Sequence, residues 1–227
     1  MGNKNTSSKP FKKEDVFIYQ QKNHICKIYI YLNNLLSGLA NGFFCLIPYP
    51  DENHLIHALI TTYRTINETF IKQNKEIKLT LNNDSEKRTI KIDDNRKIYM
   101  NKDYDTTIIE IKPEIDKINY FLELDSYLSK ENCGEIYNKT KIYLICYGKE
   151  NKTESYCGDI INIEKEKLYH ISDTASGSGG CPILSLSSFN VIGMHLGRTP
   201  KEYKAGILLK FPLEEFMKGE HFINISS

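Results

Sequence analysis

The residues best suited to do chemistry lie in a glycine- and serine-rich loop at 174–197, which reads T-A-S-G-S-G-G-C-P-I-L-S-L-S-S-F-N-V-I-G-M-H-L-G. Ser178 could attack a carbonyl carbon if a base lay within hydrogen-bond reach of its hydroxyl. The next residue, Gly179, has no side chain and cannot act as a nucleophile. The chemistry in question is acyl transfer by a serine, and it depends on which of these two residues occupies the attacking position.

This loop resembles the nucleophile loop of chymotrypsin-like serine proteases, which reads G-x-S-G-[GS]-P-[IVL] and leads into a strand ending V-I-G-x-H-x-G. The matching residues are Gly177, Gly180, Pro182 and Ile183, followed by the run V-I-G-M-H at 191–195. In this register the nucleophile position holds Gly179. The resemblance therefore implies the fold and argues against the activity.

A second register places Ser178 in the nucleophile position. Ser176 then stands where the family has its first glycine, and Cys181 becomes an insertion before the proline. The register through Gly179 has neither fault. It also aligns Thr174 with the threonine that glutamyl endopeptidases and picornavirus-type proteases carry five residues before the nucleophile. We favour Gly179 and keep Ser178 as the alternative nucleophile.

The family's base histidine is matched by a different residue type. The segments G-F-F-C-L-I-P at 42–48 and L-I-T-T-Y-R-T-I at 59–66 resemble the stretch around that histidine, and Arg64 occupies its position. An arginine stays protonated at any working pH, so it cannot take a proton from a nucleophile. His57 lies seven residues earlier, which is about 23 Å along a strand. We expect His57 and the nearby His54 on a surface hairpin.

The acid of the triad is matched by Asp105, within D-Y-D-T-T-I-I-E-I at 103–111. In the family this residue orients the histidine and stabilises the imidazolium, which is absent here. The positions for base, acid and nucleophile follow in the family's order, as Arg64, Asp105 and Gly179. We expect Arg64 and Asp105 to form an ion pair that joins the two barrels at the cleft entrance.

This sequence matches the family's substrate-binding residues better than it matches the family's catalytic residues. Thr174 and His195 correspond to residues that line the S1 pocket of glutamyl endopeptidases and picornavirus-type proteases, where they hydrogen-bond a glutamate carboxylate or a glutamine carboxamide. The oxyanion-hole donors would be the backbone N–H groups of Gly177 and Gly179. The resemblance therefore implies a cleft that can hold an extended peptide against a strand edge. The alternative for His195 is a buried core histidine.

The strand pattern indicates an all-β chain. Short segments rich in Ile, Tyr and Thr alternate with Asn, Asp, Lys and Gly turns, which favours barrels or sandwiches over βαβ units. Pro212–Gly219 is expected to form a short C-terminal helix. The expected strands are Lys27–Leu32, Phe43–Ile47, Ala58–Thr62, Glu76–Leu81, Arg88–Ile92, Thr106–Ile111, Lys141–Tyr147, Cys157–Ile163, Pro182–Leu186, Val191–Leu196 and Gly206–Phe211.

The resemblance covers residues 25–217 of the 227 and implies two six-stranded antiparallel β-barrels of the chymotrypsin type. We expect a basic tail at 1–20, an N-terminal barrel at 21–115, and a C-terminal barrel with its helix at 116–227. The seam between the barrels is expected at residues 112–126.

The composition of the chain argues against some classes of binding partner and cofactor. The net charge is +1 with both signs interspersed, which gives no footprint for nucleic acid. No metal or other cofactor is indicated, because the cysteines lack paired metal spacing. No apolar run is long enough for a transmembrane helix, and no signal peptide is expected. We interpret all six cysteines as reduced thiols, namely Cys26, Cys45, Cys133, Cys146, Cys157 and Cys181.

The N-terminus M-G-N-K-N-T fits the N-myristoylation pattern M-G-x-x-x-[ST], with Gly2 as the acceptor. Lys4, Lys9, Lys12 and Lys13 follow it and could supply the basic second signal that stable anchoring needs. The pattern predicts a cytoplasmic protein attached to membranes through an acylated N-terminus. An unmodified polar tail is the alternative.

Together these features predict a chymotrypsin-like pseudoprotease that binds or scaffolds a protein or peptide partner, with a Glu or Gln side chain in the S1 pocket. One alternative is a working serine endopeptidase of Glu/Gln preference that uses Ser178. The other is a purely structural component of a larger assembly. An open pocket would favour peptide binding, and a filled pocket would favour architecture.

Overall fold

The computed structural model describes residues 21–32, 35–148, 152–200 and 203–225. Gly2 and the lysines of the N-terminal tail, and with them the expected membrane anchor, lie outside the described residues. Within the described ranges every helix is too short or too polar to cross a bilayer.

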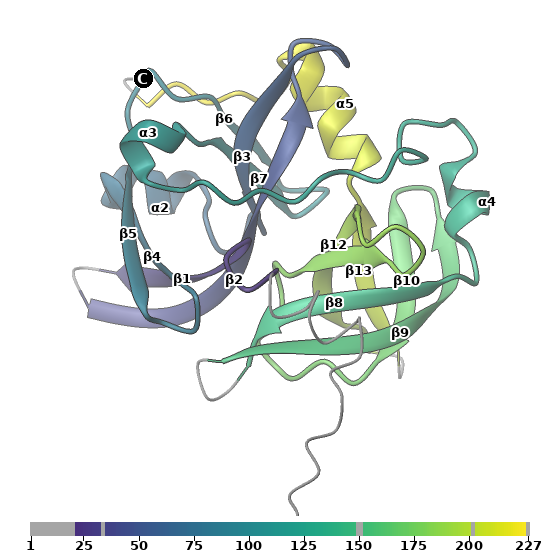
Figure 1. Ribbon diagram of the computed structural model, residues 1–227. Helices are drawn as coiled ribbons and strands as arrows, with labels where there is room; N and C mark the ends of the chain where they lie inside the picture. Colours follow the sequence, from purple (N-terminus) through teal and green to yellow (C-terminus); the bar gives the residue numbers. More distant parts are fainter. Residues whose placement is uncertain (1–20, 33–34, 149–151, 201–202, 226–227) are drawn as a thin grey trace, which may run out of the picture.

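Two halves built mainly of β-strands lie side by side, and the C-terminal helix α5 (Lys210–Lys218) lies near their junction (Figure 1). The strands of the first half are β1 (Ile25–Leu32), β2 (Leu35–Pro48), β3 (Leu55–Thr61), β4 (Glu76–Leu81), β5 (Glu86–Lys91), β6 (Ile98–Asn101) and β7 (Thr106–Glu110). The strands of the second half are β8 (Lys141–Tyr147), β9 (Thr153–Glu164), β10 (Lys167–Ser172), β11 (Pro182–Ser185), β12 (Val191–Arg198) and β13 (Lys204–Leu208). The helices are α2 (Glu68–Gln73), α3 (Pro113–Asp116), α4 (Cys133–Tyr137) and α5 (Lys210–Lys218).

The all-β, chymotrypsin-like architecture expected from the sequence is confirmed. The second half is the expected closed barrel of six strands, in the order β10-β13-β12-β11-β8-β9. The first half differs from the expected six-stranded barrel, because it is a seven-stranded sheet in the order β5-β4-β1-β2-β3-β7-β6. The strand that the sequence did not predict in this half is β6. It pairs with β7 across the tight turn that contains Asp105.

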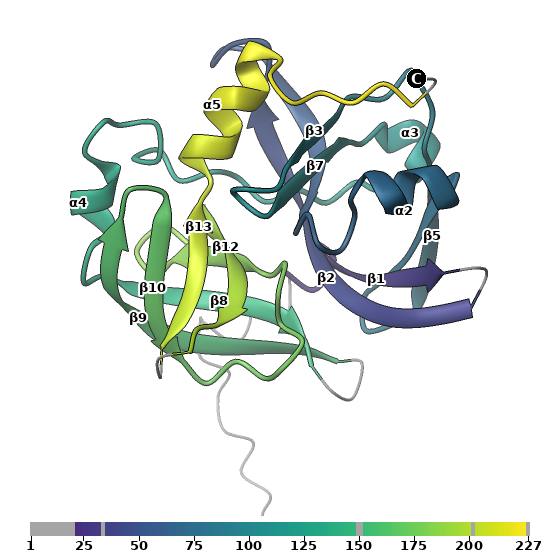
Figure 2. The same cartoon turned by 180° about the vertical axis from the view of Figure 1, so that it is seen from behind.

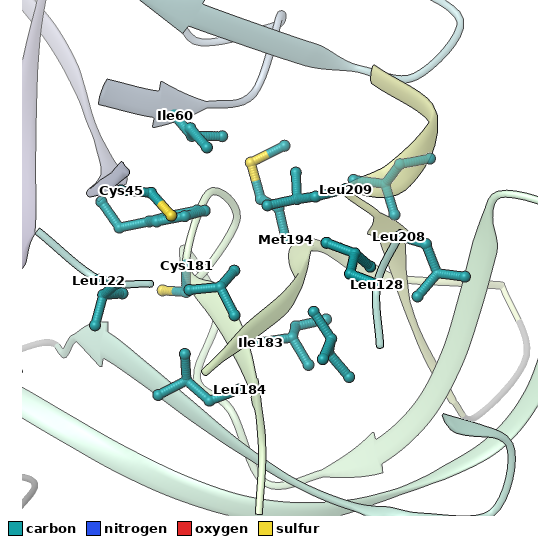
Figure 3. Close-up of a cluster of buried hydrophobic side chains, with 14 of the residues drawn as sticks. Cys45, Ile60, Leu122, Leu128, Cys181, Ile183, Leu184, Met194, Leu208 and Leu209 are labelled. Carbon is teal, nitrogen blue, oxygen red and sulfur yellow. The ribbon is translucent and has the colours of Figure 1, made fainter. Parts of the chain in front are cut away.

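The connection between the halves runs extended along both. Leu122 makes a parallel bridge to Cys45 of β2, and Leu124 makes one to Val191 of β12. Buried apolar side chains from both halves form one continuous core. In Figure 3, Cys45 and Ile60 of the first half face the barrel residues that surround Met194. This shared core fixes the relative position of the strand ends that carry the site.

The C-terminal helix forms as expected and leads the chain back to the first half (Figure 2). It begins two residues before Pro212 and ends at Gly219, whose φ of 73° is the left-handed C-cap that favours glycine. The Phe216 ring lies edge-on to Tyr99 of β6 and to Tyr49. Glu215 accepts a hydrogen bond from the Tyr99 hydroxyl at 2.8 Å. Helix α5 therefore anchors the end of the barrel on the first sheet.

The expectation that all six cysteines are reduced is wrong, because Cys146 and Cys181 form a disulfide. Cys146 lies on β8 and Cys181 directly precedes β11, its antiparallel neighbour. The pairing of Ile183 with Leu144 places the two cysteines opposite each other. Their Cα atoms are 5.3 Å apart, within the range that a disulfide spans. The free cysteines among the described residues are Cys26, Cys45, Cys133 and Cys157.

Candidate functional site

The glycine-rich loop is held by an asparagine from the other half of the molecule. Asn41 of β2 donates from Nδ2 to the Gly177 carbonyl at 2.9 Å and accepts from the Tyr147 backbone N–H at 2.8 Å. Gly177 and Gly180 have φ values of 91° and 90°, which favour glycine. A Cβ on Gly180 would also lie 2.1 Å from the Asn41 carbonyl oxygen. The loop can therefore approach β2 this closely only with glycine at position 180.

Gly179 faces Arg64, the residue that the sequence resemblance places at the position of the base. A Cβ built on Gly179 would lie 3.9 Å from Arg64 Nη2 and 3.5 Å from the Leu196 carbonyl oxygen. Both are ordinary van der Waals distances, so the space could accept a serine side chain. The structure thus brings residues 64 and 179 together, although they lie in different halves and neither has a side chain that can carry out a proton transfer or an attack.

Asp105 holds Arg64 by two contacts. Its Oδ2 pairs with Arg64 Nη2 at 2.9 Å, and its Oδ1 accepts from the Arg64 backbone N–H at 3.0 Å. The expected ion pair is present, but the expectation that it joins the halves is wrong, because both residues lie in turns of the first half. The guanidinium reaches the second half through a separate hydrogen bond to the Leu196 carbonyl of β12. Arg64 therefore links Asp105 to the barrel.

The turn before β7 positions the Asp105 carboxyl. Asp105 has a φ of 48°, a left-handed conformation that Asp adopts more readily than most residues. Its backbone N–H donates to Lys102, and its carbonyl accepts from Tyr63. Burial raises the pKa of the Asp105 carboxyl, and the contacts with Arg64 oppose that rise without cancelling it. The Asp105 carboxyl therefore orients Arg64.

The Ser178 hydroxyl is engaged by the backbone of its own loop. The residue is only 3% exposed, and its hydroxyl donates to the Ala175 carbonyl at 2.5 Å. A backbone carbonyl cannot accept the proton in a reaction at neutral pH. The histidines near the base position are also engaged elsewhere, since His57 packs on Phe121 with ring centroids 4.3 Å apart and His54 pairs with Asp51 at 2.9 Å.

Thr174 and His195 meet at one wall, together with a lysine that the sequence did not indicate. Lys204, the first residue of β13, donates from Nζ to the carbonyl oxygen and to Oγ1 of Thr174, each at 2.5 Å. His195 Nδ1 lies 3.1 Å from Nε2 of His170, whose Nδ1 lies 3.2 Å from Ser172 Oγ. Both rings are buried. The wall therefore carries two separate polar groups, the run of Ser172, His170 and His195, and the buried Lys204 with Thr174.

Burial keeps both histidines neutral. It lowers the pKa of His195 to about 3, with His170, Lys204 and Arg64 adding to the shift through repulsion. It lowers the pKa of His170 to about 4, with Lys204 adding to the shift. Each neutral ring has one N–H donor and one acceptor nitrogen. His195 is therefore an uncharged polar group in this wall.

These residues surround an open cavity of about 670 Å³ between the halves. One side consists of residues 174–179 and the end of β12, and the other of apolar residues from β1 and β2 with Arg64. The cationic residues in its lining are Arg64, Arg198 and Lys204, whereas the lining contains no Asp or Glu. The cavity thus presents positive charge, hydrogen-bond donors and an apolar wall to whatever enters it.

Potential metal ligands gather at a different place. Within the described ranges, Glu215, Glu220 and His221 have ligand atoms within 4.8 Å of one another. Glu215 already accepts hydrogen bonds from Tyr99 and from Asn101 Nδ2, both at 2.8 Å. This group therefore has a role in holding α5 on the first sheet.

No protein-family model and no curated protein matches this sequence. Solved structures do match it. Deg5 superposes with a TM-score of 0.63 at 16% identity, over 91% of this chain and 95% of that one. The chain has the trypsin-like serine protease fold. The serine endoprotease from Yersinia pestis superposes with a TM-score of 0.61 at 12% identity, over 93% of this chain and 67% of that one. The Rv3671c protease in its inactive form gives 0.56 at 12%, over 84% and 86%.

Proposed function

We propose that this protein is a pseudoprotease that uses the cleft of a trypsin-like fold to hold a peptide segment without cleaving it. The observation that carries the proposal is the position of Gly179, whose missing side chain would face Arg64 at 3.9 Å. The two positions that do the chemistry in this fold are adjacent, and they hold a residue without a side chain and a residue that cannot accept a proton.

The cavity supports binding over a purely architectural role. It measures about 670 Å³, which is large enough for several peptide side chains. Thr174 and His195 offer hydrogen-bonding groups suited to a Glu or Gln side chain, and β1 and β2 supply an apolar wall. A structural component without a ligand would be expected to have filled this space with side chains.

The rival function, a serine endopeptidase that uses Ser178, lacks support in the geometry. The Ser178 hydroxyl is buried and donates to a backbone carbonyl. Activity through Ser178 would need a rearranged loop and a new base. Arg64 also occupies the Leu196 carbonyl at the cavity wall, a backbone acceptor that an extended substrate could otherwise use.

A fluorophosphonate probe tests the absence of catalysis directly, because it labels activated serines. The protein should remain unlabelled and should not hydrolyse a panel of Glu- and Gln-containing peptides. Ser178→Ala should behave identically and serves as the matched control. Covalent labelling that disappears in Ser178→Ala would establish the endopeptidase and overturn the proposal.

A further inference from the structure

Lys204 is a buried cation whose partners are neutral. The residue is 8% exposed, and its ammonium donates to two oxygens of Thr174. Among the described residues it takes part in no ion pair. An ammonium has three N–H donors, and a buried charge without an opposite charge is unfavourable. Such a site favours a ligand that carries a negative charge.

The other cationic residues of the cavity are less suited to bind an anion. Arg64 is paired with Asp105 at 2.9 Å, and Arg198 is exposed, where solvent weakens its pairing with a ligand. His195 is neutral. Among the described residues, Lys204 thus remains as the cation that lines the cavity, is buried and makes no ion pair.

We infer that Lys204 makes this cavity select a carboxylate over a carboxamide. The ligand would be a peptide with a glutamate side chain that accepts hydrogen bonds from Lys204 Nζ and from the hydroxyl of Thr174. This inference rests on the proposed peptide-binding function and narrows its ligand from Glu or Gln to Glu. The shape of the pocket admits both side chains, and the charge separates them.

The electrostatics around Lys204 favour an anionic ligand. Burial lowers the pKa of the Lys204 ammonium, and the charge of Arg198 adds to this shift, while Asp173 partly opposes it. A ligand carboxylate against Nζ would raise that pKa again, because an opposite charge favours the protonated form. A neutral amide would have a much smaller effect.

The selection can be tested with two pools of acetylated heptapeptides, which have Glu or Gln at the centre and random residues elsewhere. Each pool competes with a fluorescent reference peptide for binding to the protein. The reference peptide is chosen from the peptides that the protein binds. The Glu pool should bind about tenfold more tightly than the Gln pool, as expected for one charge-assisted hydrogen bond. Lys204→Met should abolish this ratio, Lys204→Arg should retain most of it, and Lys167→Met, on the exposed side of β10, should leave it unchanged.

The outcomes separate the two claims. Equal binding of both pools to the wild-type protein would overturn the selection by Lys204 and leave the peptide-binding function standing. Failure of both pools to bind would count against the proposed function, and the second measurement would then decide the inference.

That measurement follows the Lys204 side-chain resonance of the wild-type protein by NMR during a pH titration. The probes are propionate and propionamide, which mimic the two side-chain ends. Propionate should raise the Lys204 pKa, and propionamide should not. Equal effects of the two probes, or no effect of either, would overturn the inference without requiring any variant to fold.

Discussion

Asp105 contacts Arg64 at both its backbone and its side chain, through Oδ1 at 3.0 Å and Oδ2 at 2.9 Å. The backbone contact needs no particular side chain at position 64. The same carboxylate could therefore position a histidine backbone at that place. In this protein it positions a cation, whose guanidinium extends to the Leu196 carbonyl of the barrel.

Removal of Asp105 should cost more stability than removal of Arg64. Arg64→Ala loses an exposed ion pair, with the Arg64 side chain 57% exposed, so we expect a loss of about 1 kcal/mol. Asp105→Ala also leaves the Arg64 backbone N–H without its acceptor and places alanine at a φ of 48°. We expect about 2 kcal/mol for this variant.

Urea unfolding measures both values, with Asp105→Asn as the control. Asparagine keeps an oxygen acceptor and tolerates the left-handed conformation, so it should resemble Arg64→Ala. Equal losses for Asp105→Ala and Asp105→Asn would show that the backbone contact contributes nothing.

The two buried histidines should make the fold sensitive to mild acid. In the folded state their pKa values lie at about 4 for His170 and about 3 for His195, below the ordinary 6.5 of the unfolded chain. Between these values the unfolded state binds more protons, so stability is fully present above pH 6.5 and is lost as the pH falls. At pH 5 the loss is about 2 kcal/mol for each histidine.

Urea unfolding at pH 7 and pH 5 checks this expectation. His195→Gln should remove about half of the difference between the two pH values. His54→Gln, which changes an exposed histidine, should leave the difference intact. If the wild-type protein and His195→Gln had the same pH dependence of stability, His195 would not be a source of the acid sensitivity.

The disulfide should stabilise the loop that carries Gly179. Cys146 and Cys181 are 35 residues apart, and closing a loop of that length contributes about 4 kcal/mol in the chain-entropy description. Reduction should lower the Tm by several degrees, and peptide mapping without reductant should recover the two cysteines in one cross-linked fragment. Cys157→Ser, at the exposed free cysteine, should leave the response to reductant unchanged. A Tm that does not respond to reductant would contradict the cross-link.

The geometry also predicts how activity could be introduced. Gly179→Ser should fit without displacing its neighbours, because the added Cβ meets only ordinary contacts. Alone it should not react with a fluorophosphonate, since Arg64 cannot accept the serine proton. Arg64→His combined with Gly179→Ser should give detectable labelling that needs both changes. Labelling of the Gly179→Ser protein alone would show that another base operates in the cleft.

The sequence predicted those parts of the site that depend on local motifs. The order of Arg64, Asp105 and Gly179 could be aligned because each lies in a short segment with a recognisable pattern. The strands were predicted where apolar and β-branched residues form runs. Two strands, β6 and β10, were missed. β6 has only four residues, and β10 has Lys167 and His170 among its six, so neither forms a long run of apolar and β-branched residues.

The residues that the sequence did not reveal depend on long-range contacts. Lys204, at the start of β13, reaches Thr174 in the loop after β10 across 30 residues of sequence. His170 meets His195 across 25 residues. The cysteine pair likewise forms only because β8 and β11 are neighbours in the closed barrel. No local pattern encodes these contacts, so only the folded chain brings them together.

The most direct test of binding without cleavage is a mass spectrum of peptides retained by the immobilised protein. The Glu-centred heptapeptide pool would be incubated with the protein for several hours, washed and eluted with acid. We expect intact heptapeptides, enriched over the amount retained by the Lys204→Met protein, and no fragments ending at the central residue. Fragments that end in glutamate and accumulate with time would contradict the central claim.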